Sequence, residues 1–391
     1  MCINLSVPSK LLPIALTAIT VVMLKVIIEH WLSLVINFKF SVANVVLMTF
    51  ATLLILFLFL EVVFRFAIPA AKKPLAVFDL DNRLLRSHES RRTTGTYTMG
   101  KRGEIRAKWR INNFGWNSMI DYSTERSTRG LVSIIGGAEI RALRVDVGKD
   151  ISSLLRLKIQ PEYEVYSFGH DGAPLSQYLH VSRYANEYFK PDIFVFVIVH
   201  SDFHESIANI VRRPYFLQLG MAEGRIEEIE PTTRPLYQFL TYSATFRYLF
   251  TNLKLASLYF NLIENPADFN ANVDIKTLSS PRDSIRHGAE YLLTKIQAEN
   301  SGKRIIFMMN APVQDIYNDQ VETSSVMWIN KMVESLCDRH GLECIDLTTA
   351  FSNDYKATAQ RFDFRIDGHW NEHAHFLASE ILHDYLIATE Q

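Results

Sequence analysis

Two long apolar stretches near the N-terminus constrain this chain more than any other feature. Residues 11–37 and 42–68 both exceed the roughly 20 residues that a helix needs to cross a bilayer. The second stretch carries no charge from Val42 until Glu61, which predicts a spanning helix. We therefore expect the lipid bilayer to be one partner of this chain.

The first stretch is interrupted by Lys25, Glu29 and His30. Lys25 and Glu29 are four residues apart, so they can pair on one face of a helix. We expect residues 1–68 to form a membrane anchor of two transmembrane helices, arranged as an antiparallel hairpin. The alternative is an interfacial helix followed by one span. Neither stretch ends in a small-residue cleavage site, so we expect the anchor to remain in the mature protein.

The charge balance argues against a nucleic-acid partner, and the cysteine content does not indicate a compartment. Lys and Arg number 41 against 42 Asp and Glu, and there is no long basic run, so we expect no nucleic-acid partner. Cys337 and Cys344 flank a predicted turn from helix to strand. A disulfide and two free thiols both fit this spacing, and we favour free thiols.

The chain changes character after the anchor. Residues 69–130 are rich in Arg, Lys, Ser, Thr and Gly, and predict a linker and an irregular lead-in with edge-strand structure. From residue 131 short apolar runs predict five strands, at 131–135, 163–168, 193–199, 304–309 and 343–347. Amphipathic patterns predict helices around them, at 140–157, 175–189, 284–299, 323–339 and 372–387.

This alternation defines the expected fold class. It predicts an α/β domain over residues 131–391, with a doubly wound, parallel five-stranded sheet in a flavodoxin-like sandwich. An insertion at about 207–280 interrupts the pattern and carries many aromatic residues. We expect these mostly to form core, and the alternative is a cap over the site or a docking surface for another membrane protein.

Unusual residues stand at three of the predicted strand ends and before the last helix. The blocks are Gly136-Gly137-Ala138, Gly169-His170-Asp171-Gly172, His200-Ser201-Asp202 and Asp367-Gly368-His369. Ligands of open α/β sheets bind outside the carboxyl ends of the strands. We therefore expect Ala138, Gly172, Ser201 and His369 to converge at that edge of the sheet.

The order and spacing of these blocks resemble the SGNH (GDSL-type) hydrolase superfamily over residues 105–390. The lead-in 109–118 also resembles that of bacterial membrane-anchored members, some of them associated with acylation of surface polysaccharide. The resemblance implies that Gly172 supplies a backbone oxyanion donor, that His369 is the general base and that Asp367 orients it. Ala138 stands where the family has its nucleophilic Ser, and Ser201 stands where it has the oxyanion Asn.

A chain that lacks this serine is not expected to follow the ordinary acyl-enzyme route, because removing the nucleophile costs roughly 10⁶ in turnover. The leading hypothesis is a catalytically degenerate protein that acts as a binding or assembly component of a membrane complex, with an acyl group or glycan as ligand. The alternative is an active esterase or O-acyltransferase on acylated surface glycan with a relocated nucleophile, Ser201 first in line. Neither requires a cofactor.

Two further readings of these residues stay open. His200, Asp202, His204 and Glu205 could hold a metal ion, but their spacing matches no familiar motif and we expect no metal site. The segment 367–371 could instead start and cap the last helix without any chemical role.

The resemblance implies the bacterial inner membrane but does not give the side of the soluble body. The positive-inside rule favours a cytoplasmic body, because basic residues follow the second span. Anchored members of the resembled class act mostly outside the cytoplasm. The basic residues in question are Arg65, Lys72, Lys73, Arg83 and Arg86.

Overall fold

The computed structural model describes residues 25–29, 32–33, 42–87, 93–125, 129–222, 225–232, 242–255, 269–270, 273–274 and 281–388. Most of the first expected span, residues 11–37, lies outside these ranges. Within them, one helix is long and apolar enough to cross a membrane, at Ala43–Ala67 with a mean hydropathy of 2.6. The two-helix hairpin therefore remains a prediction.

A parallel five-stranded sheet forms the centre of the body. Its strand order is β13-β12-β7-β5-β6, and all neighbouring strands are parallel. In chain order this is 2-1-3-4-5, the flavodoxin-like order of doubly wound sheets. The expected fold class is thus confirmed, and so are the five predicted strands. Their bounds are β5 Gly130–Gly136, β6 Tyr163–Gly169, β7 Ile193–Ile198, β12 Arg304–Met309 and β13 Glu343–Asp346.

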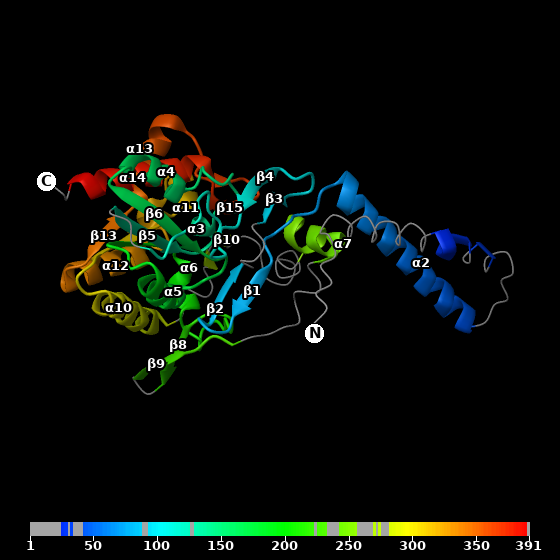
Figure 1. Cartoon of the computed structure of the whole chain (residues 1–391), viewed down its shortest axis with the longest axis horizontal. Coiled ribbons are helices and arrows are strands. Elements are labelled where there is room, and N and C mark those ends of the chain that lie inside the picture. Colours follow the sequence, from blue (N-terminus) through cyan, green and yellow to red (C-terminus); the bar gives the residue numbers. More distant parts are fainter. Residues whose placement is uncertain are drawn as a thin grey trace.

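Helices cover both faces of this sheet (Figure 1). Because side chains alternate along a strand, Phe194 and Phe196 face one helical layer, while Val195 and Val197 face the other. The first layer contains α5 Leu175–Tyr188, α10 Arg282–Glu299 and α12 Met327–His340. The second contains α4 Ile151–Ile159, α11 Val313–Tyr317, α13 Thr348–Thr358 and α14 Glu372–Ala388.

The helix expected at 140–157 is wrong as a single element. It is divided into α3 Ala138–Arg141 and α4, because Ala142 takes a left-handed conformation with φ 50° and Gly148 has φ 101°. The Asp150 side chain then accepts a hydrogen bond from the Ser153 amide and caps α4. In the segment between the two helices, Arg144 reaches Asp171 and Asp367, and the Val147 amide donates to the Lys108 carbonyl of the lead-in.

The lead-in is more regular than its composition indicated. It contains two antiparallel hairpins with a small core of their own, which includes Tyr97, Ile105 and Trp109. Leu143 packs into the same core, so the lead-in lies against the loop between α3 and α4. The strands are β1 Ala76–Asp79, β2 Leu84–Ser87, β3 Thr94–Met99 and β4 Ile105–Arg110.

The insertion is described only in part. After α6 Ser201–Glu205 it contains the antiparallel hairpin of β8 Gln218–Ala222 and β9 Arg225–Ile229, followed by the short helix α7 Ala244–Arg247 and a π-helical turn, η4 Tyr248–Asn252. Strands β10 Phe269–Asn270 and β11 Val273–Asp274 form a further short pair.

The apolar helix α2 Val42–Val62 projects from the body and continues into a π-helical turn, η1 Val63–Ala67 (Figure 1). None of its most apolar window is buried inside the protein. Its end is fixed to the insertion, because the Glu61 carboxylate accepts hydrogen bonds from the Ser243 hydroxyl at 2.8 Å and from the amides of Ala244 at 2.8 Å and Thr245 at 3.0 Å. Phe64 also stacks on Tyr248.

Cys337 and Cys344 form a disulfide in the structure, with their Cα atoms 6.3 Å apart. The expectation of free thiols is therefore wrong. The turn from α12 to β13 includes Gly341 with φ 62°. That left-handed glycine reverses the chain and brings the two cysteines together.

Candidate functional site

The structure brings the predicted blocks to the carboxyl edge of the sheet. Ala138 begins α3 directly after β5, Gly172 follows β6, and Ser201 begins α6 after β7. His369 lies in β15 Asp367–Trp370, which pairs with β14 Asp363–Phe364 and precedes α14. Because α3 contacts β15, Ala138 and His369 belong to the same end of the sheet.

The turn that holds Ala138 is closely packed. A Cβ at Gly169 would lie 2.1 Å from the Arg141 amide nitrogen, and a Cβ at Gly136 would lie 2.4 Å from a side-chain carbon of Ile140. Both glycines therefore allow α3 to approach β5 and β6 closely. Ala138 is buried at 8% exposure and offers only a methyl group at this position.

His369 and Asp367 form a hydrogen-bonded dyad. His369 Nδ1 lies 2.8 Å from Asp367 Oδ1. The two residues are two apart in a strand, so their side chains emerge on one face, and the family spacing of three is not needed. Since an ionised carboxylate only accepts, Nδ1 donates, and in the singly protonated form of the ring Nε2 is an acceptor.

Asp367 is held as an anion. Its buried carboxylate also accepts from Arg144 Nε and Lys254 Nζ, each at 3.1 Å. Burial acts to raise its pKa, but the hydrogen bond from His369 and the charges of Arg144 and Lys254 hold that pKa well below its usual range. The orientation of His369 is therefore fixed by a fully ionised partner.

Ser201 does not join the dyad. It is buried, and among the described residues no hydrogen bond connects it to His369. The neighbouring Asp202 accepts from the Tyr178 hydroxyl at 2.7 Å and from the Val199 amide at 2.9 Å. Burial raises the pKa of Asp202 well above its usual range, and the charge of Glu205 adds to this.

The residues that could have formed a metal site have other partners. His200 Nε2 lies 2.8 Å from Asn330 Oδ1, and Glu205 accepts from Arg213 at 2.5 Å. In the part of the chain that the structure describes, no three His, Cys, Asp or Glu residues are grouped so that they could hold a metal ion.

Sequence reasoning missed a group of charged residues around the dyad, which we call the cation cluster: Lys73, Arg141, Arg144 and Lys254. Arg141 and Arg144 share Asp171, at 3.4 and 3.1 Å. Lys73 and Arg144 both lie over the Tyr97 ring. The presence of two arginines within six residues after Ala138 was a usable signal. Lys73 and Lys254 come from segments that are distant in the sequence, so no sequence signal connected them with the dyad.

Two buried polar atoms beside the cation cluster have no hydrogen-bond partner among the described residues, namely Tyr97 Oη and His170 Nε2. His170 Nδ1 lies 3.0 Å from the Asp171 carbonyl, so it must donate, which leaves Nε2 as an acceptor. Burial, and then the charge of Arg141, lower the pKa of His170 to about 3. The ring is therefore neutral at physiological pH.

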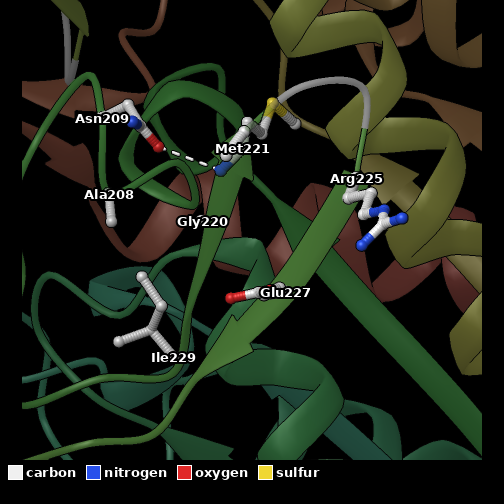
Figure 2. A pocket seen from close by; sticks show the side chains of 8 residues that line it. Ala208, Asn209, Gly220, Met221, Arg225, Glu227 and Ile229 are labelled. Atoms are coloured by element: carbon white, nitrogen blue, oxygen red, sulfur yellow. Dashed lines mark hydrogen bonds between the residues drawn. The ribbon is translucent and has the colours of Figure 1, made fainter.

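A separate hollow of about 360 Å³ lies on the β8–β9 hairpin (Figure 2). Its lining includes Asn209, Met221, Arg225 and Glu227, and Asn209 Oδ1 accepts from the Met221 amide at 3.0 Å. None of the residues in the four blocks belongs to it, so it is distinct from the strand-end site.

Comparison with known proteins gives distant structural similarity only. No family model and no curated protein matches the chain. Similar solved structures include a lipase/acylhydrolase from Enterococcus faecalis, with 13% identity, a TM-score of 0.36 and coverage of 66% of this chain and 95% of that one. A member of the lipolytic protein G-D-S-L family from Veillonella parvula DSM 2008 has 11% identity, a TM-score of 0.34 and coverage of 64% and 94%.

An acetyl xylan esterase, AlAXEase, is similar at 12% identity and a TM-score of 0.35, with coverage of 64% and 96%. At these low TM-scores the similarity by itself establishes neither a shared fold nor a shared activity. The doubly wound α/β fold of this body is shown by its own strand order and parallel pairing, and the four blocks lie at the carboxyl edge of that sheet.

Proposed function

We propose that this chain is a membrane-anchored, catalytically degenerate SGNH-hydrolase-like protein that binds a ligand at the strand-end site and serves as a component of a membrane complex. One observation carries the proposal. The His369–Asp367 dyad is fully assembled, yet the residue at the nucleophile position is Ala138. Such a site can bind and orient a ligand, but it has no hydroxyl for attack on an acyl carbon.

Membrane anchoring is supported by α2. At 1.5 Å per residue, Val42–Leu60 would be about 28 Å long, close to the ~30 Å hydrocarbon core of a bilayer. The first charged residue of the helix, Glu61, has its carboxylate hydrogen-bonded to the insertion. The charge thus falls where the helix would leave the lipid.

The test is ester hydrolysis by the full-length protein in detergent, with p-nitrophenyl acetate as substrate and His369→Ala as the matched control. We expect both proteins to show the background rate. Ala138→Ser alone should restore little, because Ser201 still replaces the oxyanion donor. The double variant Ala138→Ser, Ser201→Asn should hydrolyse the ester roughly 10²-fold faster than Ala138→Ser alone, because one oxyanion donor usually contributes a factor of this size. Turnover by the natural chain that His369→Ala abolishes would overturn the proposal.

A further inference from the structure

The cation cluster around the dyad carries more positive charge than its partners neutralise. Four cations face only two carboxylates, Asp171 and Asp367. Among the described residues, Lys73 has no carboxylate within ion-pair distance, and its Nζ lies over the Tyr97 ring, 5.7 Å from the ring centroid. The two buried arginines are matched by these carboxylates, so the excess positive charge is that of Lys73, which is exposed, and of Lys254. Both lysines are accessible to an anion from solvent, and an anion would compensate their charge.

The cluster is graded from a buried floor to an open rim. Arg141 and Arg144 are 7% and 9% exposed and form the floor with Tyr97, which is fully buried. Lys254 is 36% exposed, Asp171 24% and His369 21%, so the rim is accessible from solvent. A ligand that reached the rim would meet Lys254 there, with His369 of the dyad beside it.

A second, independent observation points to a ligand. Tyr97 Oη is a fully buried hydroxyl without a partner in the described part of the chain, although buried polar groups are normally hydrogen-bonded. A hydroxyl can donate to an oxyanion. The nearby His170 Nε2 is an unpaired acceptor and suits a ligand hydroxyl or a protonated oxygen.

We propose that the strand-end site binds an oxyanion of the phosphate, sulfate or carboxylate type, held by the cation cluster and the Tyr97 hydroxyl. This inference rests on the proposed function, since it names the ligand class of the same site. Arg144 and Arg141 supply planar guanidinium groups suited to oxyanions, and Lys73 and Lys254 supply flexible point charges.

The position of the site makes a membrane component one source of this anion. Segment 243–254 runs from the Glu61 carboxylate to the rim, where Lys254 reaches Asp367. At helical rise this segment is about 16 Å long. The rim is therefore near the end of α2, within reach of a lipid headgroup, while a free phosphate or acidic sugar has the same chemistry.

The experiment uses the full-length chain in nanodiscs of phosphatidylcholine, titrated with inorganic phosphate in a calorimeter. We expect saturable binding that Lys73→Gln and Lys254→Gln each weaken roughly tenfold, the scale of a lost charge-assisted hydrogen bond. Lys356→Gln, an exposed lysine on α13, is the matched control and should leave the affinity unchanged. Thermal unfolding of each variant establishes that it is folded.

A second arm separates the sources. Native mass spectrometry of protein released from discs that contain phosphatidylglycerol should show retained phosphatidylglycerol if the anion is a headgroup. The double variant Lys73→Gln, Lys254→Gln should lose it. Retention of phosphatidylglycerol without phosphate binding would identify the ligand as a lipid headgroup. Phosphate binding without retention of phosphatidylglycerol would identify it as a soluble anion. Both support an oxyanion site.

No saturable binding in either arm, or equal binding by the lysine variants, overturns the inference. Ester hydrolysis measured on the same preparations keeps the two proposals apart. If neither turnover nor anion binding is observed, the oxyanion site is contradicted, while the proposal of a catalytically degenerate site is still supported. Turnover that depends on His369 would instead remove the proposed function, whatever the binding result.

Discussion

His369 Nδ1 lies 2.8 Å from Asp367 Oδ1, and this pair is supported by Arg144 and Lys254 although no serine stands at position 138 for it to activate. An orienting carboxylate with three cationic or donor partners is a costly arrangement to bury. Its persistence is accounted for if the pair has a structural and ligand-positioning role.

The first prediction concerns the stability that Asp367 provides. Asp367→Asn removes the charge that compensates buried Arg144, and breaking a buried pair in this way costs about 3 kcal/mol. We expect a clear fall in the thermal unfolding midpoint of the full-length protein in detergent. Asp338→Asn, at an exposed position of α12, should change stability by less than about 0.5 kcal/mol. Equal midpoints for the two variants would contradict the role given to Asp367.

The second prediction concerns pH. Burial lowers the pKa of His375 from its usual value to about 4, and Nδ1 of this ring accepts from the Ile151 amide at 3.3 Å. The unfolded chain, with a histidine pKa of about 6.5, binds a proton before the folded chain does. Stability is therefore complete above about pH 6.5 and falls as the pH drops toward 4, by about 1.4 kcal/mol per pH unit for this histidine.

The buried neutral His170 acts in the same direction, with its pKa lowered to about 3. Unfolding midpoints measured between pH 7 and pH 4.5 should fall, and His375→Gln should make the fall shallower because one titrating group is removed. A variant with the same pH slope as the natural chain would show that folding does not lower the pKa of His375.

The third prediction concerns the junction between α2 and the body. Glu61→Ala removes the acceptor for the amides of Ala244 and Thr245. A hydrogen bond to a charged group contributes about 1.5–3 kcal/mol, so these amides should exchange with deuterium roughly ten- to hundredfold faster. Glu334→Ala, at an exposed site on α12, is the control and should leave their exchange unaltered. Unchanged exchange in Glu61→Ala would mean that α2 is not docked through this carboxylate.

The fourth prediction concerns topology. Disulfides persist in oxidising compartments, so from the Cys337–Cys344 bond we predict that the soluble body lies outside the cytoplasm, although the positive-inside rule favours a cytoplasmic body. If residues 1–68 form the predicted hairpin, the N-terminus lies on that same side. Labelling of cysteines introduced at Ser9 and Ser352 in intact cells should therefore modify both. If only the cysteine at position 352 is labelled, the N-terminus and the body lie on opposite sides and the chain crosses the membrane once.

The sequence predicted those parts of the fold that depend on local pattern. Continuous apolar runs such as 193–198 indicate buried parallel strands, and the blocks at their ends predicted that Ala138, Gly172, Ser201 and His369 lie at the carboxyl edge of the sheet. The divided helix was not predicted, because the apolar pattern continues through Ala142 and only its left-handed backbone breaks the element.

The cation cluster was largely beyond sequence reasoning. Arg144 meets Asp367 across 223 residues, and Lys254 meets Asp367 across 113. Tyr97 reaches the site from the β3–β4 hairpin of the lead-in, whose short strands carry many polar residues and predict irregular structure. Lys73 reaches it from the segment that precedes β1. Contacts of this kind depend on tertiary packing and leave no periodic signal in the chain.

The most direct test of catalytic degeneracy is reaction with a fluorophosphonate probe, which labels a serine that a neighbouring base activates. The full-length natural chain should give no adduct by intact mass spectrometry, while Ala138→Ser should acquire one at position 138 that His369→Ala removes. An adduct on Ser201 of the natural chain, lost in His369→Ala, would contradict the account and identify an active enzyme with a relocated nucleophile.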